Sequence, residues 1–422
     1  MNDAFINSYF HGGSSKFRDG YRITSMKPEL TGHLDYLSMR DKIGANEFIR
    51  NLLISIFIHN ITYIKTTDLF ILFKYLSVNK TLRLIQSDFL KLVDDNGLDT
   101  GLLVDAENKK FIGFFENSYL HPDRKKADDF DTSFDYLSFQ VGKAPIPKEM
   151  KSALLFNVEN KTILFDVGQT IEKIKKELDY DFLNGNITSK FGIENENIED
   201  IKDENINKIF RLVKSNQGLL YSAILNTDNL ICEANSSVDF ENKFKNLYNV
   251  NINQSTESFN VLTNKLGVPD FTDLILNNVI TIDEFLELRQ KRGSYKFREW
   301  FYQIEHNKDL AIENLLSQSN IKNKNKVLSF LRWSFSNAIG MIEPISGTIY
   351  SAVDTFILDK LLSGWSPNLY LNKTLGDYLN KKMQIKNKEL KEEQKEKYFG
   401  KIGRNDKCPC KSGRKYKQCC GK

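Results

Sequence analysis

Apolar residues in the first hundred positions recur at intervals of three and four. This spacing gathers side chains along one face of an α-helix. The positions with this spacing are Phe48, Leu52, Ile56, Leu69, Leu72, Phe73 and Leu76, and a further helix is indicated by Phe89, Leu90 and Val93. Residues 1–100 are therefore predicted to be mainly helical. Residues 1–30, which contain the glycine- and serine-rich stretch 11–15 and few apolar positions, are expected to be loop or partly disordered and to add nothing to a core.

Two later stretches share a Glu-Asn-Lys turn signal between apolar residues. They are residues 102–109 and 154–161, and β-forming residues follow each turn. The pattern predicts two β-hairpins in one small antiparallel sheet. Internal duplication is the alternative explanation of their likeness.

A strand is predicted over residues 162–165, and residues 166–170 directly after it read Asp-Val-Gly-Gln-Thr. This D-x-G-x-T form resembles a phosphate-binding loop of the actin-like ATPases. Those enzymes also need a second acidic loop and an adenosine loop, neither of which is found in the sequence. A capped turn between a strand and a helix is therefore the favoured interpretation.

A capping box marks the clearest helix start in the chain. Thr281 can accept a hydrogen bond from the backbone of Glu284, whose carboxylate then reaches back to residue 281. The face expected to turn toward a core comprises Ile282, Phe285, Leu286, Phe297, Trp300, Phe301 and Ile304. The face expected to point outward comprises Arg289, Arg292, Arg298 and Glu299.

Residues 327–365 form the most apolar region of the chain, and between positions 333 and 353 only Glu343 is charged. Such a stretch is long enough to be considered as a membrane segment. Glu343-Pro344 and Gly347 interrupt its centre, however, so two buried helices are favoured over insertion into a bilayer.

Four of the five cysteines lie in the last twenty residues, at Cys408, Cys410, Cys419 and Cys420. Two closely spaced pairs suit a tetrahedral zinc ion, and four thiolates leave no open position for water. We therefore expect a structural Zn²⁺ site rather than a catalytic one. Disulfide pairing is the alternative, which the adjacent cysteines and the lack of a signal peptide disfavour.

The tail resembles the SEC-C motif, a zinc-binding tail of the bacterial protein-export ATPase SecA and of many otherwise unrelated bacterial proteins. The matching positions are Gly403-Arg404-Asn405-Asp406, Cys408-Pro409-Cys410, Ser412-Gly413, Lys415-Tyr416-Lys417 and Cys419-Cys420-Gly421. Lys407 and Lys411 depart from the proline and glycine that are usual in the family. The resemblance covers about a twentieth of the chain, and it implies metal binding and docking to a protein or ribosome, not an enzymatic activity.

Charge divides the chain unevenly. Residues 381–422 hold 15 Lys and Arg against 5 Asp and Glu, a net +10, which leaves −6 for the rest of a chain whose total is +4. Such a basic segment suits an acidic protein surface, RNA or anionic lipid, although a solvated helix is the plain alternative. The side chains expected to bind a partner are Arg404, Lys411, Arg414, Lys415, Tyr416 and Lys417.

The sequence shows no assembled catalytic pattern. Its five histidines are scattered, and it contains no phosphate loop of the G-x-x-x-x-G-K-[ST] form. Arg298 and His306 invite comparison with the R-x(4 to 6)-H pattern of the HEPN ribonucleases, but seven residues intervene, and eight lie between Arg50 and His59. His59, at the end of an apolar face, is interpreted as a core histidine.

Composition indicates a globular protein, because 41% of the residues are apolar and 27% are charged. The N-terminal residues have no basic flank or apolar signal core, and Cys232 is expected to be a small buried side chain. We therefore predict a cytoplasmic location with no stable membrane span.

Together these patterns predict an α+β fold that is mainly α-helical, with a small antiparallel β region and a C-terminal zinc knuckle. The expected parts are a helical region 1–100, an α+β region 101–260, a helical domain 261–380, a charged helical linker 381–400 and the zinc module 401–422. The predicted function is docking of a bacterial cytosolic protein to a protein or ribosome through this module. The alternatives are an effector enzyme acting on RNA or nucleotides in stress or phage defence, and a membrane-acting effector that uses residues 333–353.

Overall fold

The computed structural model describes most of the body and the C-terminal arm. The described residues are 3–7, 14–18, 21–25, 39–94, 98–105, 111–118, 147–165, 167–183, 185–193, 205–232, 251–252, 256, 259–260, 263–264, 267–306, 369–399 and 403–420. The apolar stretch 333–353, considered above as two core helices or a membrane segment, lies outside them. None of the helices in these ranges combines the length and the apolar character needed to cross a bilayer.

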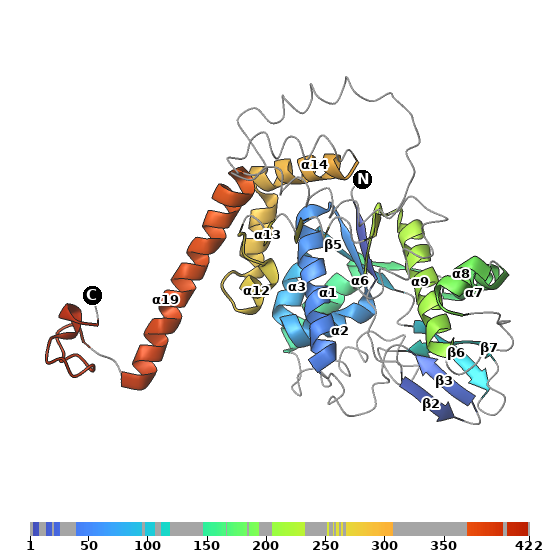
Figure 1. Ribbon diagram of the computed structural model, residues 1–422, viewed down its shortest axis with the longest axis horizontal. Helices are drawn as coiled ribbons and strands as arrows, with labels where there is room; N and C mark the ends of the chain where they lie inside the picture. The colour runs from blue at the N-terminus through green and yellow to red at the C-terminus, as the bar shows by residue number, and fades with distance from the viewer. Residues whose placement is uncertain are drawn as a thin grey trace, which may run out of the picture.

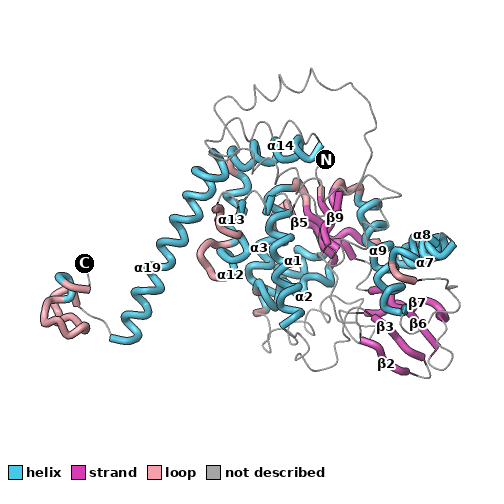
Figure 2. Tube along the Cα trace, in the orientation of Figure 1, coloured by secondary structure: helices cyan, strands magenta, loops and turns pink. Residues whose placement is uncertain are grey.

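A six-stranded parallel sheet forms the centre of the body (Figure 2). Its strands are β1 (Ala4–Asn7), β4 (Thr62–Lys65), β5 (Leu90–Asp94), β8 (Thr162–Leu164), β9 (Asn229–Cys232) and β10 (Asn251–Ile252), in the order β10-β9-β1-β4-β5-β8. All five pairings are parallel. The prediction of an antiparallel β region is therefore wrong for the principal sheet, and so is the helix expected around Leu90 and Val93. The expectation that residues 1–30 contain only loop and no core is also wrong, because Ala4, Phe5 and Ile6 of β1 are buried.

Short strands explain why the pattern of apolar residues missed this sheet. Strands β4 and β9 have four residues each, all of them buried. A parallel strand that is covered on both faces has no alternation of apolar and polar residues to reveal it. Cys232 is buried at the end of β9, as expected.

Helices cover both faces of the sheet (Figure 1). On one side lie α1 (Met39–Ile58), α3 (Val78–Gln86) and α6 (Lys148–Lys161), and on the other lie α7 (Val167–Leu183), α8 (Gly185–Lys190) and α9 (Ile206–Leu225). The crossover connections between parallel strands nearly all have the same handedness. Helices therefore lie on opposite faces of the sheet before and after the point where the strand order reverses direction. The helical turns between β4 and α3 are η2 (Thr66–Asp68), α2 (Leu69–Ile71) and η3 (Leu72–Leu76).

A second, four-stranded sheet is antiparallel, in the order β2-β3-β6-β7. Its strands are β2 (Ser14–Arg18), β3 (Tyr21–Ser25), β6 (Leu98–Asp105) and β7 (Phe111–Ser118). Strands β6 and β7 form the first predicted hairpin. The second predicted hairpin, at residues 154–161, is wrong, because these residues belong to α6. Leu154 and Val158, four residues apart, are both buried in the main core, so helical spacing prevailed over the turn signal.

A further helical layer packs on α1. It contains α12 (Phe271–Leu276), α13 (Ile282–Gln290), α14 (Arg292–His306) and η5 (Tyr370–Gly376), which continues into α19 (Asp377–Phe399). Aromatic rings join this layer to α1, since the centroid of Phe57 lies 4.8 Å from that of Phe271 and 6.5 Å from that of Phe297. The helix predicted over 381–398 is part of α19, whereas the division of the chain into regions stays a prediction.

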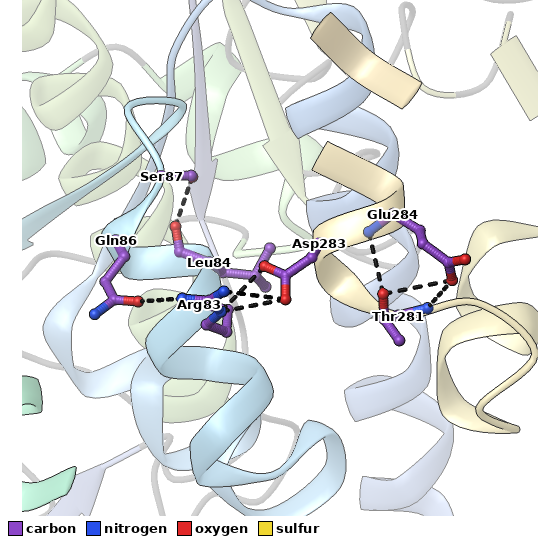
Figure 3. Close-up of polar contacts among 7 residues, drawn as sticks. All are labelled: Arg83, Leu84, Gln86, Ser87, Thr281, Asp283 and Glu284. Atoms are coloured by element: carbon purple, nitrogen blue, oxygen red, sulfur yellow. Dashed lines mark hydrogen bonds and ion pairs between the residues drawn. The ribbon is translucent and has the colours of Figure 1, made fainter. Parts of the chain in front are cut away.

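The predicted capping box is present at the start of α13 (Figure 3). The Glu284 backbone amide donates to Thr281 Oγ1 at 3.1 Å, and the Thr281 amide donates to Glu284 Oε2 at 2.9 Å. In the same turn Asp283 pairs with Arg83 of α3, with Nε and Oδ1 3.0 Å apart. The N-terminus of α13 is therefore fixed both within its own helix and against α3.

Two arginines of this layer contradict the prediction that they face outward. Arg289 is 3% exposed and Arg298 is 8% exposed. Arg289 donates from Nε to the carbonyl of Ile56 and from Nη2 to the carbonyls of His59 at 2.7 Å and Asn60 at 3.0 Å. Carbonyl groups at a helix C-terminus lack partners within the helix and attract cations. The end of α1 therefore provides the polar partners that make burial of Arg289 tolerable.

His59 immediately follows α1 and is completely buried, which agrees with its interpretation as a core histidine. Burial lowers the pKa of His59 from 6.5 to about 3, and the neighbouring Arg289 cation contributes in the same direction. The imidazole is therefore neutral in the folded protein at neutral pH.

This histidine should make stability depend on pH. Below pH 6.5 the unfolded chain takes up a proton that the folded chain excludes, so the free energy of unfolding falls as the pH drops from 6.5 toward about 3. The slope due to one group is at most about 1.4 kcal/mol per pH unit. Urea denaturation of the wild type and of His59→Gln at pH 7 and pH 5 measures it. The variant should lose less stability over this interval, and parallel losses in the two proteins would contradict the assignment.

Candidate metal centre

The C-terminal module, residues 403–420, is carried at the far end of α19 (Figure 1). The other end of this helical segment is anchored in the body, where Leu371, Leu375 and Leu379 are buried in the main core. The Tyr370 hydroxyl lies 2.5 Å from the Ser294 hydroxyl, and Lys382 forms an ion pair with Glu284. The 23 residues of α19 span about 35 Å, which holds the module away from the body.

A small hairpin-like backbone shapes the module. Cys408 donates its backbone amide to the carbonyl of Arg414 at 2.8 Å, and Tyr416 donates to the carbonyl of Asp406 at 2.8 Å. The turn between these two hydrogen-bonded segments contains Lys411 and Gly413, whose φ angles are 61° and 71°. A single 3₁₀ turn, Tyr416–Gln418, then leads to the last two cysteines. Residues distant by about ten positions are thereby brought together.

The four cysteine sulfurs converge on one point. All four Sγ atoms lie within 4.8 Å of one another. The Sγ atom of Cys410 is 3.3 Å from those of Cys408 and Cys419, and the Sγ atoms of Cys419 and Cys420 are 3.9 Å apart. Ligands about 2.3 Å from a tetrahedral ion stand about 3.8 Å from each other. The observed cluster therefore has the size of a four-thiolate site that can hold a metal ion.

Electrostatics also favour a cation among these sulfurs. The hydrogen bond between Cys410 and the Ser412 hydroxyl, together with the neighbouring thiols, lowers the pKa of Cys410 to about 6. The interactions with Cys408, Cys410 and Cys419 raise the pKa of Cys420 to about 12. The thiolate form of Cys410 is thus stabilised, whereas Cys420 resists ionisation because the other three cysteines lie beside it. A bound divalent cation removes this conflict, because it stabilises all four negative charges together.

The module has almost no apolar core of its own. Of residues 403–420, Cys408 is buried, at 4% exposed, and the others are half-buried or exposed. A segment of this size normally needs a metal or disulfides to hold its fold. The convergence of the sulfurs is therefore its main source of tertiary structure.

The side chains predicted to bind a partner lie on the surface of this module. Exposed side chains are Arg404, Lys411, Arg414, Lys415 and Lys417, and Tyr416 is half-buried beside them. Their partner stays a prediction. The structure adds that all of them lie within one short module at the end of α19.

Other chemistry considered from the sequence does not assemble in the described part of the chain. Arg298 donates to the carbonyl of Arg289 at 2.8 Å, Arg50 pairs with Asp270 at 2.8 Å, and His59 is enclosed in the core. Arg298 is therefore not an exposed cation and His59 is not an exposed histidine, and the side chain of His306 lies outside the described part of the chain. Residues 167–170 of the D-x-G-x-T stretch form the first turn of α7, which follows β8 in the chain, and Asp166 lies outside the described residues.

Comparison with known proteins agrees with the geometry of the tail. A family model described as the SEC-C motif matches residues 404–422. The protein translocase subunit SecA of Maridesulfovibrio salexigens is 58% identical over 36 residues, which are 8% of this chain and 4% of that protein. No solved structure matches the chain. The similarity is thus confined to the C-terminal end, and residues 404–422 are a SEC-C motif.

Proposed function

We propose that this protein docks to another macromolecule through a zinc-stabilised C-terminal module. The observation that carries the proposal is the convergence of Cys408, Cys410, Cys419 and Cys420 within 4.8 Å in a module with almost no core. Four thiolates suit Zn²⁺, and a site closed by four protein ligands has a structural role rather than a catalytic one. The metal would therefore shape a binding surface.

The position of the module supports docking. It stands at the end of a helix about 35 Å long, and its exposed cations account for part of the net +10 of residues 381–422. We infer that the partner is a protein, which includes a protein of the ribosome. The half-buried ring of Tyr416 is fixed by the backbone that leads to Cys419, so the surface around it depends on the folded module. No described residue favours the RNA-cleaving or membrane-acting alternatives.

Metal content tests the first step. The purified protein should contain one Zn²⁺ per chain, and a Cys419→Ser/Cys420→Ser variant should contain little, because two of four ligands are lost. Elemental analysis gives the ratio. A Cys232→Ser variant is the matched control, since this cysteine is buried in the sheet and should not change the zinc content. Unchanged zinc in the tail variant would refute the ligand set.

The turn that contains Lys411 and Gly413 tests the link between folding and metal binding. Lys411 adopts a left-handed conformation in which a side chain costs roughly 1 kcal/mol relative to glycine. Lys411→Gly should therefore tighten zinc binding by about fivefold in chelator competition. Gly413→Ala should weaken it to a similar degree through the backbone alone, because the added methyl group would meet no atom within 4 Å. Equal zinc affinities of the wild type, Lys411→Gly and Gly413→Ala would contradict the expected link between the conformation of this turn and metal binding.

Capture of partners from a cell lysate tests the docking. Full-length protein loaded with zinc should retain its partners at high salt, and removal of zinc should release them, because the folded surface is lost. Single changes of Lys411, Arg414, Lys415 or Lys417 to alanine should weaken capture only slightly. The opposite pattern, with partners retained after zinc removal but lost steadily with salt and with each lysine change, would point to RNA or anionic lipid.

A further inference from the structure

The parallel sheet changes its direction of winding beside β1. The chain passes from β1 to β4, β5 and β8 on one side, and then returns to β9 and β10 on the other side. In open parallel sheets, ligands bind outside the carboxyl ends of the strands at such a reversal. In this protein that position lies where Asn7 ends β1 beside Cys232, which ends β9.

The antiparallel sheet is built from the same edge. The chain leaves the carboxyl end of β1 to form β2 and β3, and it leaves the carboxyl end of β5 to form β6 and β7. Strand β3 pairs with β6, so the β2-β3 pair and the β6-β7 pair form one sheet. Strand β3 also contacts α9 (Figure 1). The fold therefore places a second structural unit next to the carboxyl edge of the parallel sheet.

Lys65 occupies this edge in an unusual setting. It is the last residue of β4, the strand next to β1, and it is only 8% exposed. Alternation along the strand puts it on the same face as Tyr63, which packs in one cluster with Tyr221 of α9. Within the residues that the structure describes, no carboxylate forms an ion pair with its ammonium group; the buried Asp68 carboxylate accepts the Lys65 backbone amide instead, at 3.1 Å. A largely buried ammonium group without an ion pair is costly, and an anionic ligand would offset that cost.

Buried hydrogen-bonding groups of α9 lie near the same edge. Tyr221 packs against Phe5 in the middle of β1, with their ring centroids 5.9 Å apart. Because α9 leads into the amino end of β9, the turn that precedes Tyr221 lies closer to the carboxyl edge. That turn holds Gln217, whose Nε2 is 3.0 Å from the Tyr221 hydroxyl, and the buried Ser215 and Asn216. A few buried polar groups beside an apolar sheet face are typical of small-molecule sites.

The opposite, amino edge of the sheet also carries lysines. A depression of about 380 Å³ there is lined by Lys91 and Lys161, among others. Lys161 already donates to the carbonyls of Gln86 at 3.1 Å and Ser87 at 2.5 Å, so its ammonium holds the loop before β5. Lys91 lies on the strand next to Lys65, two residues nearer the amino edge. It therefore supplies a matched control.

We propose that the carboxyl edge of the parallel sheet, where β1, β4 and β9 meet, binds a nucleotide whose phosphate is held by Lys65. Residues 1–380 carry a net charge of −6, so attraction of an anion to the body depends on local cations such as Lys65. The polar side chains of α9 would contact the uncharged part of the nucleotide. This site is separate from the zinc module and needs no metal from it.

Binding to the full-length protein tests the proposal with three probes: ATP as a mononucleotide, NAD⁺ as a dinucleotide and inorganic phosphate alone. At 100-fold excess over its dissociation constant, a nucleotide should raise the melting temperature by roughly 5 °C. Calorimetric titration gives the affinities, and the tighter of the two nucleotides identifies the class. Phosphate alone should bind at least about 100-fold more weakly; equal affinity would reduce the site to a simple anion site and overturn the assignment.

Variants locate the site. Lys65→Met should weaken nucleotide binding by about 10- to 100-fold, because a charged hydrogen-bond donor is lost. Lys91→Met removes the same charge from the neighbouring strand and should leave the affinity unchanged. No binding of either nucleotide to the wild type, or equal binding to wild type and Lys65→Met, would overturn the proposal.

Hydrogen exchange of the wild type covers the case in which Lys65→Met fails to fold. A bound nucleotide should slow exchange in peptides that contain Lys65–Asp68 and residues 215–221, while peptides of the C-terminal module stay unchanged. Slowing confined to residues 403–420 would assign the nucleotide to the basic tail and refute the site on the sheet.

Discussion

The arrangement of the body depends on how the carboxyl end of α1 is satisfied. Arg289 reaches from α13 to the carbonyls of Ile56, His59 and Asn60, and Arg298 of α14 donates in turn to the carbonyl of Arg289. The same helices hold the base of the arm through Ser294 and Glu284. A chain of polar contacts thus runs from the sheet-covering helix α1 to α19. The position of the C-terminal module therefore depends on interactions made far from it.

The module itself is stabilised differently, because it cannot draw on apolar burial. Its backbone hydrogen bonds close a small turn, but only Cys408 is buried among its described residues. Metal binding must therefore supply most of its folding free energy. The body and the module are consequently expected to respond to different conditions: acid acts on the body through His59, whereas chelation acts on the module alone. Such independence suits a tag that is attached by a rigid helix.

Features set by local spacing could be predicted from the sequence, and features set by distant partners could not. The cysteine cluster and the Thr281–Glu284 capping box involve residues within about a dozen positions, and both are present as predicted. The parallel sheet could not be predicted because its short strands pair with partners more than twenty residues away. The burial of Arg289 could not be predicted for the same reason, because the carbonyls that accept its hydrogen bonds lie more than two hundred residues earlier. Lys65 ends the short strand β4, yet only the topology shows that this strand lies next to β1 and so near the winding reversal.

The C-terminal module and the proposed site at Lys65 differ in the net charge of their surroundings as well as in their position. The basic arm and module are suited to a macromolecular surface, while the acidic body would repel the same polyanions or acidic proteins. A nucleotide bound at Lys65 would still be attracted locally, because solvent screens the charge of a largely buried cation only weakly. Under the two proposals, a large partner at one end of the molecule and a small anion at the other would not compete. The same separation means that docking affects the body only if it changes α19, whose contacts with Glu284 and Ser294 form the physical connection between the two sites.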